Sequence, residues 1–441
     1  MPNPQIPSTE FAQRRADLAR SIGADSVAIC FAAAEVTRSR DTQFPFRQDS
    51  DFHYLTGFPE PDAVMVLAPG RADGEFVLFV RPKDREREIW DGYRAGVEGA
   101  CRDYGADQAF SLEDLAAELP NLFANRQQIV HSLGAQPQHD KIVLNALAGV
   151  RAQARNGVHA PENVTGLAGL LAAMRLYKSP AELDMMRHAS KVSAQAHCRA
   201  MRASAPGVTE YQLQAHITHE FAMHGMESAY GMIVGGGANA CVLHYIDNSA
   251  ALEDGSLCLI DAGAEYQGYA ADITRTFPVN GRYSAVQKDV YEVVLAAQLA
   301  AIEAVKVGGI WTDPHTAATR VLTQGLVDLG ALQGDVDALI EDNAQTAFFM
   351  HKTGHWIGLD VHDVGAYRNG DSWQKLAANQ VLTVEPGLYF APDNPAAPDA
   401  LKGIGIRIED DVAVTAEGPE VLTADVPKTV AGIEDLMREE R

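Results

Sequence analysis

The sequence predicts two domains: an α/β domain over residues 1–175 and an α+β domain over residues 176–441. A chain of 441 residues is too long for one compact core. Its first part alternates short apolar runs with helix-like segments, which is typical of an α/β arrangement. Its second part places long amphipathic patterns before a series of short strands, which favours helices packed on a largely antiparallel sheet.

The amino-terminal domain begins with a helix pattern that ends near residue 22, for which Ser8 is a candidate N-cap. A second helix is expected near residues 112–123. Apolar runs bounded by turn residues predict short strands at residues 26–31, 63–68, 75–80 and 141–144. This domain holds no cluster of acids and histidines, so we predict that it is not catalytic.

The second domain is predicted to begin at a helix start near residues 175–180. Ser179 is followed by Pro180 and, three residues after the serine, by Glu182, which is the pattern of a capping box. Helices are expected from this point to about residue 201, after a second box at residues 209–212, and at residues 284–307 and 313–329. Short strands that alternate with loops are expected from about residue 345 onward.

Composition restricts the partners and the compartment of the chain. Its 59 acidic and 36 basic residues give a net charge of −23, which argues against nucleic acid or an anionic membrane as partner. We find no signal peptide and no apolar run of about 18 residues, so a cytoplasmic protein is expected. The cysteines are scattered and form no CxxC pair, which predicts reduced thiols and no cysteine-ligated zinc: Cys30, Cys101, Cys198, Cys241 and Cys258.

Two aspartates in an expected hairpin are the first candidate metal ligands. Asp261 ends an apolar strand, residues 266–268 form the turn, and Asp272 begins the return strand. If the turn centres on residues 266 and 267, Asp261 faces Asp272 at roughly 5 Å. Two carboxylates that close repel each other unless a cation lies between them. The alternative is a pair of surface aspartates at strand ends.

Three further segments carry unusual polar residues: 351–363, 383–389 and 404–410. Arg407 and Glu409 alternate with isoleucines and are therefore expected on one strand face, while Glu385 precedes a Pro-Gly pair expected to end its strand. His351 and His355 are four residues apart, but this is not a zinc-protease HExxH, so a loop or short strand is expected. Alternatively, these segments are a core histidine, a turn and a surface ion pair.

Taken together, Asp261, Asp272, His355, Glu385 and Glu409 form an oxygen-rich ligand set. Four carboxylates balance the charge of two divalent cations, and one imidazole adds a nitrogen ligand. Such a set suits manganese, cobalt or iron better than a sulfur-rich structural zinc site. Paired metals activate water and polarise a carbonyl group, so hydrolysis of an amide or ester is the expected reaction.

The five positions, in this order, resemble the metal centre of the pita-bread metallopeptidases. This family contains methionine aminopeptidase, prolidase, aminopeptidase P and the non-metal enzyme creatinase. The resemblance covers nearly the whole chain and is strongest to aminopeptidase P. It implies a pita-bread (creatinase/aminopeptidase-type) fold for residues 176–441. The motifs that carry it are DTQFPFRQDSDFHYLTGFPEPDAV, REREIWDGYR, VLHYIDN, DAGAEYQGYAADITRTFPVNGRYS, HWIGLDVHDVG, VLTVEPGLY and GIGIRIEDD.

The resemblance implies a ligand role for each of the five residues. Asp261 and Asp272 would hold one metal, and Asp272 would bridge to the second. His355 and Glu385 would complete the second metal, and Glu409 would bridge both. Glu385 would also accept the proton of the bridging water and carry it to the leaving amine.

Other matched residues are implied to line the cleft. His244 and His362 would contact the substrate or stabilise the tetrahedral intermediate, and His351 would lie beside them. Arg407 would orient the carboxylates, and Tyr389 is a further cleft candidate. The family pattern often has glycine directly after the first histidine of its HxxxH segment, whereas this chain has Lys352. That departure bears on the shape of the cleft and on substrate preference.

The implied activity is release of the N-terminal residue from peptides with proline at the second position, by attack of a metal-bridging hydroxide. Two divalent ions are expected, with manganese favoured over cobalt, iron or zinc. Prolidase shares the ligands but cleaves only dipeptides, and an inactive binding relative is a further alternative. The subgroup commonly forms dimers or tetramers, so a homo-oligomer is expected. The amino-terminal domain would then build the subunit contacts and narrow the cleft.

Overall fold

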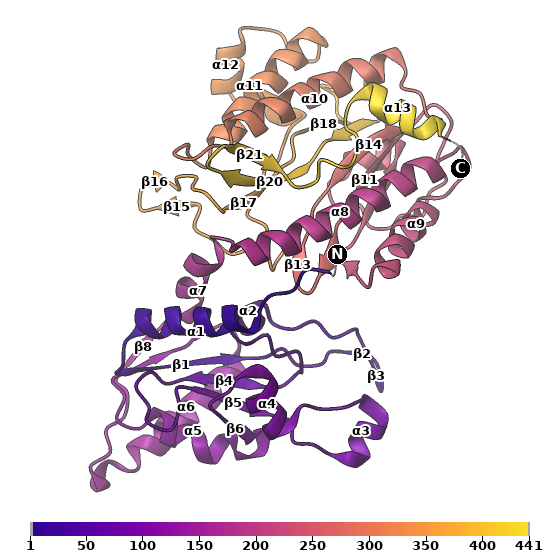
Figure 1. Cartoon of the computed structure of the whole chain (residues 1–441). Coiled ribbons are helices and arrows are strands. Elements are labelled where there is room, and N and C mark those ends of the chain that lie inside the picture. Colours follow the sequence, from indigo (N-terminus) through magenta and orange to yellow (C-terminus); the bar gives the residue numbers. More distant parts are fainter. Residues whose placement is uncertain (1–2, 440–441) are drawn as a thin grey trace. The chain divides into compact units, whose positions relative to one another are not determined.

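The computed structural model describes residues 3–439, which divide into two compact units (Figure 1). The amino-terminal unit is Ile6–Met174. The other unit contains residues 175–439 together with residues 3–5, and it is called the catalytic unit below because the sequence predicts the site there. Within residues 3–439, no helix combines the length and apolar character needed to cross a membrane. Each unit has its own sheets and helices and is described separately.

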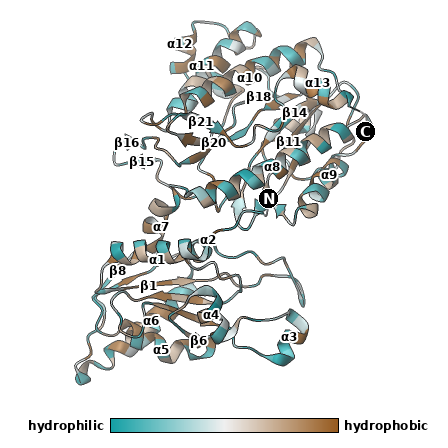
Figure 2. Cartoon of the chain, in the orientation of Figure 1, coloured by the Kyte–Doolittle hydropathy of each residue, from teal (hydrophilic) through white to brown (hydrophobic). Residues whose placement is uncertain are grey.

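The amino-terminal unit is built on a mixed six-stranded sheet in the order β6-β5-β4-β1-β7-β8. Strand β4 pairs antiparallel with β1 and β5, and the remaining pairs are parallel. In Figure 2 the strands of this sheet are mainly hydrophobic, in agreement with a core in which β1, β4 and β5 are buried. The strands are β1 (Ser26–Phe31), β4 (Val64–Leu67), β5 (Phe76–Val80), β6 (Gln108–Ser111), β7 (Gln128–Val130) and β8 (Asn163–Thr165).

Helices of this unit pack against the sheet or connect its strands, and a small hairpin of β2 (Thr37–Ser39) and β3 (Thr42–Gln43) precedes α2. The helices α5 and α6 contribute buried residues to the same core as the central strands. The seven helices of this part are α1 (Ser8–Ile22), α2 (Ser50–Thr56), α3 (Arg85–Asp91), α4 (Gly96–Tyr104), α5 (Leu115–Phe123), α6 (Pro137–Arg151) and α7 (Leu167–Arg175).

Two local predictions for this unit were wrong. Residues 141–144 lie inside α6 and form no strand. The buried residues Val143, Leu147 and Val150 recur every three or four positions, so the true period is helical, and a four-residue window is too short to show it. Ser8 is the first residue of α1 rather than its cap, because Pro7 occupies the N-cap position without a side-chain hydrogen bond.

In the catalytic unit, the capping boxes predicted at Ser179 and Thr209 are both confirmed. The helices α10 and α11 lie side by side above the later strands in Figure 1. The helices of this unit are α8 (Pro180–Ala203), α9 (Glu210–Met223), α10 (Ala285–Ala304), α11 (Asp313–Asp328), α12 (Val336–Glu341) and α13 (Val430–Arg438).

The strands of the catalytic unit form small antiparallel sheets, which confirms the predicted α+β character. Their orders are β10-β11-β14, β13-β12-β9, β17-β20-β21, β18-β19 and β15-β16. The strands are β9 (Glu227–Ser228), β10 (Ile233–Gly236), β11 (Leu257–Asp261), β12 (Ala264–Tyr266), β13 (Tyr269–Ala270), β14 (Thr274–Pro278), β15 (Arg368–Asn369), β16 (Ser372–Trp373), β17 (Val381–Val384), β18 (Gly387–Phe390), β19 (Ile404–Arg407), β20 (Asp410–Thr415) and β21 (Gly418–Val421).

The register of the aspartate hairpin differs from the expected one. Tyr266 pairs with Tyr269, so the turn consists of Gln267 and Gly268, both at positive φ. Asp261 consequently lies opposite Thr274 rather than opposite Asp272. The pairing is displaced by two positions, and a displacement of two keeps a side chain on the same face. The two aspartates are therefore diagonal neighbours.

The predicted strand end at the Pro-Gly pair is confirmed, since β17 ends at Val384 and a separate strand, β18, begins at Gly387. Val384 pairs with Asp410 at the end of β17, and Gly387 pairs with Arg407 at the start of β18. The register is the same on both sides of the interruption. It therefore places Glu385 opposite Glu409 at the point where the two short sheets meet.

Candidate metal centre

A cavity of about 240 Å³ in the catalytic unit brings the predicted site residues together. Nine of the ten predicted ligand and cleft residues lie on its wall, although they come from several separate segments of the sequence, and Tyr389 is not among the lining residues. The residues that line it are Leu243, His244, Asp261, Asp272, His351, Lys352, Gly354, His355, His362, Glu385, Arg407 and Glu409.

Asp261 and Asp272 are buried on one side of this cavity and share one neighbour. The hydroxyl oxygen of Tyr230 lies 2.7 Å from Asp261 Oδ1 and 2.5 Å from Asp272 Oδ1. A hydroxyl group has one proton, so it can donate a well-aligned hydrogen bond to only one of these carboxylates at a time. Arg407 provides a hydrogen-bonded ion pair to the other oxygen of Asp261.

His355 lies between the carboxylates of two different strand pairs. Its Nε2 atom is 3.6 Å from Asp272 Oδ2 and 3.8 Å from Glu385 Oε1. Its Nδ1 atom lies 3.0 Å from the carbonyl oxygen of Trp356, so Nδ1 donates there and the lone pair of Nε2 is directed to the cavity in the neutral tautomer. Ligand atoms of Asp272, His355 and Glu409 all fall within 4.8 Å of one another, a spacing that one metal ion could bridge.

Glu409 is held in place by a hydroxyl group rather than by a close cation. Thr274 Oγ1 donates a hydrogen bond of 2.6 Å to Glu409 Oε2, and the Arg407 Nε atom is 3.9 Å from the same oxygen. An isolated bridge pairs Thr274 with Glu409 in the backbone, so the sheet that carries Asp261 also fixes Glu409.

The pKa shifts show that this cluster carries more negative charge than its own cations balance. Burial, followed by the charges of neighbouring carboxylates, raises the pKa of Glu409 well above its usual range. Burial also raises the pKa of Glu385 to about 7, although His355 and Arg407 oppose the shift. The pKa of Asp261 is raised by burial too, against the charge of Arg407. Divalent cations would remove this excess charge, so the donor set fits a metal site.

The histidines of the cavity differ in charge state. Burial would lower the pKa of His355, but the nearby carboxylates of Asp272 and Glu385 raise it to about 9. Burial and the charge of Arg407 lower the pKa of His351 to about 4, so this ring is neutral near pH 7. Burial and the charge of His355 lower the pKa of His362, whose ring meets that of His355 edge-on at 4.4 Å between centroids.

The lining residues His351 and Arg407 are connected through the buried Tyr389 behind them. The hydroxyl oxygen of Tyr389 lies 2.8 Å from His351 Nε2 and accepts a hydrogen bond of 3.1 Å from Arg407. Arg407 also donates to Thr274 at 3.1 Å, so one buried guanidinium joins the carboxylate side of the cavity to the histidine side. His244 and His362 are more exposed and lie at the mouth.

Sequence reasoning missed three residues that hold this centre. Tyr230 contacts both aspartates, Thr274 binds Glu409, and the carboxylate of Asp411 accepts the backbone N–H of Asp272 at 2.9 Å. Asp411 is the last residue of the GIGIRIEDD motif and could have been included. Tyr230 had no local signal, because it reaches the site through the pairing of β9 with β12.

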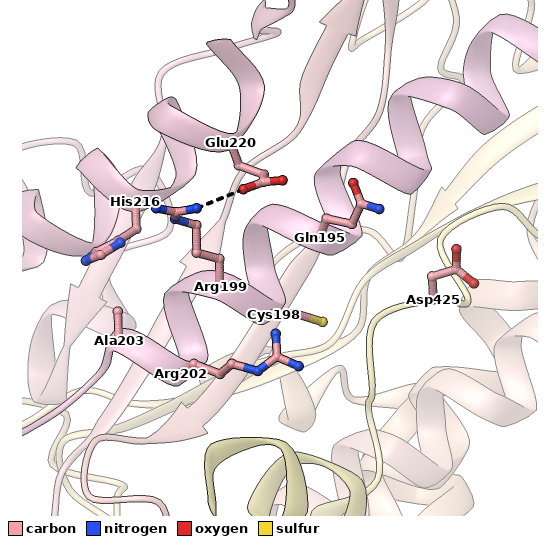
Figure 3. A pocket seen from close by; sticks show the side chains of 8 residues that line it. All are labelled: Gln195, Cys198, Arg199, Arg202, Ala203, His216, Glu220 and Asp425. Carbon is pink, nitrogen blue, oxygen red and sulfur yellow. Dashed lines mark hydrogen bonds and ion pairs between the residues drawn. The ribbon is translucent and has the colours of Figure 1, made fainter. Parts of the chain in front are cut away.

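A larger cavity of about 750 Å³ lies along α8 and α9 but has a different composition (Figure 3). Its arginines already have partners: Arg199 is 3.2 Å from Glu220, and Arg202 binds Glu439. It contains no cluster of convergent carboxylates and histidines comparable with that of the smaller cavity. The smaller cavity is therefore the candidate site.

Comparison with known proteins agrees with this choice. Residues 184–416 match metallopeptidase family M24, and residues 11–131 match the N-terminal domain of aminopeptidase P. The chain belongs to metallopeptidase family M24. The predicted family is thus confirmed, and the matched segment contains all five candidate ligands.

Relatives match over almost the whole length. A Xaa-Pro aminopeptidase of Escherichia coli (strain K12) is 44% identical over 435 residues, which cover 98% of each chain. The solved structure of the Pseudomonas aeruginosa aminopeptidase PepP is 52% identical, with a TM-score of 0.97 and 98% of each chain covered. A zinc-substituted E. coli aminopeptidase P in complex with product has a TM-score of 0.95 at 44% identity and 98% coverage of each chain. The predicted fold class, with its pita-bread catalytic domain, is confirmed.

Proposed function

We propose that this chain is a metallo-aminopeptidase that releases the N-terminal residue from peptides with proline at the second position. The observation that carries the proposal is the meeting of five candidate ligands in one cavity, in a chain whose full-length relatives are Xaa-Pro aminopeptidases. Solved relatives include an aminopeptidase P in complex with product and another with the inhibitor Pro-Leu. These complexes support a peptide substrate that contains proline.

We propose two divalent cations, with manganese as the first candidate and cobalt, iron or zinc as alternatives. Asp261 and Asp272 would hold one ion and His355 with Glu385 the other, while Asp272 and Glu409 would contact both. When bound, such ions lower the pKa of a water molecule and polarise the scissile carbonyl group. The excess of buried negative charge described above supports this assignment.

Glu385 is the proposed general base and acid. A carboxylate beside a metal-bound water can take its proton and return it to a leaving amine. Its Oε1 atom is 3.4 Å from Thr383 Oγ1, which donates a hydrogen bond to it, and its Oε2 atom is 3.9 Å from His351 Nδ1. The contact with Thr383 supports a defined orientation for the proposed proton carrier.

The remaining cavity residues are proposed to bind and orient the peptide. The exposed imidazoles of His244 and His362 can donate hydrogen bonds to a carbonyl oxygen that becomes negative during attack. The neutral ring of His351 uses its one N–H on the carbonyl oxygen of Lys352, so it would shape the cleft beside them. Arg407 is a positioning residue, because its bonds to Asp261, Thr274 and Tyr389 keep the carboxylates apart from one another. His351→Ala or His362→Ala should lower turnover while most of the bound metal is retained.

The same ligands would serve a prolidase, so chain length is the deciding test. Metal-stripped protein would receive manganese and be offered an X-Pro-Y tripeptide, an X-Pro dipeptide and an X-Ala-Y control. Metal-dependent cleavage of the tripeptide above both others supports the proposal. Cleavage of the dipeptide alone would move the assignment to prolidase. Bound metal without any cleavage would favour an inactive binding relative.

We also propose that the amino-terminal unit forms the subunit contacts of a homodimer or homotetramer and narrows the substrate cleft in that assembly. It would contribute no catalytic residue of its own. The large apolar side chains of Ile89, Trp90 and Tyr93 are 74%, 85% and 96% exposed, which is unusual unless another surface covers them. Light scattering after gel filtration would test this, and a monomer at micromolar concentration would contradict it. The five free cysteines support a reducing compartment, for which we propose the cytoplasm.

A further inference from the structure

Lys352 lies on the wall between two cavities of the catalytic unit. It lines the candidate metal centre, and it also lines a second cavity of about 260 Å³. Both cavities also share Gly354, so they adjoin across this short loop. The side chain of Lys352 is exposed, and its ammonium group forms no hydrogen bond or ion pair with any of residues 3–439. The ammonium is therefore available to a ligand.

The second cavity is apolar and has an aromatic wall. The rings of Trp311 and Tyr367 contact each other at 4.7 Å between centroids, and Trp373 lies under the guanidinium of Arg368. The other lining residues are Thr312, Pro314, His315, Thr353, Leu382 and Thr383. Burial and, after it, the charge of Lys352 lower the pKa of His315 to about 4, so Lys352 is the cation of this cavity near pH 7.

The charge of Lys352 indicates which end of a substrate it meets. A free peptide has an ammonium group at the end where an aminopeptidase cuts and a carboxylate at the other end. An ammonium on the wall repels the first and attracts the second. The wall near Lys352 therefore favours the side of the substrate beyond the scissile bond. Arg368 lies against Trp373, but Lys352 is the cation that lines both cavities. An apolar cavity lined by such a cation fits one residue with an apolar side chain and a terminal carboxylate.

We propose that Lys352 and the aromatic cavity form a subsite for the C-terminal residue of short peptide substrates. The ammonium binds the terminal carboxylate, and the cavity takes the apolar side chain. The preferred substrates are then X-Pro-Y tripeptides with a free carboxylate and a leucine-like or aromatic third residue. This inference rests on the proposed function and specifies its substrate class.

The first test compares an X-Pro-Leu tripeptide with its C-terminal amide in the metal-loaded protein. We expect a kcat/KM ratio of roughly five in favour of the free acid, since a partly exposed ion pair contributes little more than this. Lys352→Gln should bring the ratio close to one, and so should about 1 M salt in the parent protein. Lys288→Gln makes the same change on the exposed surface of α10 and should keep the parent ratio. An unchanged ratio in Lys352→Gln would overturn the role of the lysine.

The second test varies the third residue and the cavity wall. X-Pro-Leu and X-Pro-Phe should exceed X-Pro-Ala in kcat/KM by on the order of tenfold, mainly through KM. Trp373→Ala should reduce this preference, and Trp373→Phe should restore most of it, with the unfolding temperature as a check on folding. Equal rates for all three peptides would exclude the subsite. That result is distinct from failure of the proposed function, in which no X-Pro-Y peptide is cleaved.

Discussion

Glu409 and Asp410 are adjacent in the sequence and equally buried, yet their surroundings are opposite. Asp410 accepts hydrogen bonds of 2.7 Å from Arg275, Lys428 and Gln298. Burial would raise its pKa, but the charges of Arg275 and Lys428 keep the pKa below its usual range. The protein therefore supplies all the cations that this carboxylate needs.

Glu409 points the other way, as alternate residues of an extended chain do. Its neighbours are the carboxylates of Asp272, Glu385 and Asp261, and its pKa is raised well above the usual range. Side chains neutralise one carboxylate completely and leave the other without a sufficient counter-charge. Asp410 thus belongs to a structural ion network, whereas Glu409 belongs to a site suited to an external cation. The two kinds of surroundings lie on opposite sides of the same stretch of chain.

The largest expected effect is on the Glu409 side. Glu409→Gln should abolish peptide cleavage, by on the order of a thousandfold or more, and should lower bound metal, while helical content is unchanged. Activity, metal content and circular dichroism would be measured together. Glu253→Gln makes the same chemical change at an exposed position and should behave like the parent protein. If Glu409→Gln or Asp261→Asn retained turnover, the assignment of that residue as a ligand of a catalytic metal would be wrong.

For Asp410, in contrast, the substitution Asp410→Asn should lower the free energy of unfolding. Removing one charge leaves Arg275 buried with less compensation, which costs about 3–5 kcal/mol. Chemical or thermal unfolding would show this as an early loss of the catalytic unit. The protein that remains folded should still bind metal. If Asp410→Asn lost metal without losing stability, the division between the two carboxylates would be wrong.

The effect of metal on stability should also distinguish the surroundings of Glu409 from those of Asp410. A cation that binds only the folded state at about one hundred times its Kd raises stability by roughly 2.7 kcal/mol. We expect manganese to raise the unfolding temperature of the stripped parent protein and of Asp410→Asn, but not of Glu409→Gln. A chelator should reverse the shift. Equal shifts in all three proteins would place the metal elsewhere.

The smallest expected effect concerns the protonation of His197. Besides burial, the charges of Arg275, Asp272 and Asp410 all act on its pKa, so this histidine lies near the surroundings of both Glu409 and Asp410. Burial lowers its pKa to about 4, and its Nε2 lies 2.9 Å from the carbonyl oxygen of Ala262. The unfolded chain takes up this proton below about pH 6.5 and the folded chain does so only near pH 4, so stability falls as the pH is lowered through this range.

Between pH 7 and pH 5 this histidine should cost about 2 kcal/mol. The measurement is the unfolding temperature of the parent protein and of His197→Gln at both pH values. The carboxylates titrate in both proteins, so the difference between the two isolates the histidine. Parallel pH profiles would show that His197 does not contribute.

Residue type and order predicted the site better than local geometry did. Asp261, Asp272 and Glu385 could be chosen because chemistry needs such groups, and a family pattern preserves their order. The hairpin register depended on the positive φ of Gln267 and Gly268. The glycine favours this pair over Tyr266 and Gln267, on which the expected turn was centred. Tyr230 could not be found, since only the pairing of distant strands brings it to the aspartates.

For the secondary structure, too, patterns of particular residue types were predicted better than features that depend on a longer stretch of chain. The capping boxes at Ser179 and Thr209 were visible because they are local hydrogen-bonding patterns. The misassigned strand at residues 141–144 shows the opposite case, in which a run of three apolar residues after Lys141 fits either period. Longer windows that included Val150 would have favoured the helix.

The unbroken register across Glu385 and Glu409 has a consequence for changes in chain length. The segment of residues 391–403 joins β18 to β19 beyond the paired region, so insertions there leave the opposition of the two glutamates intact. A single-residue deletion between Val381 and Glu385 would instead rotate the alternation and point the wrong side chain at the cavity. Natural and engineered variants should therefore accept length variation in the loop and reject it in the strands.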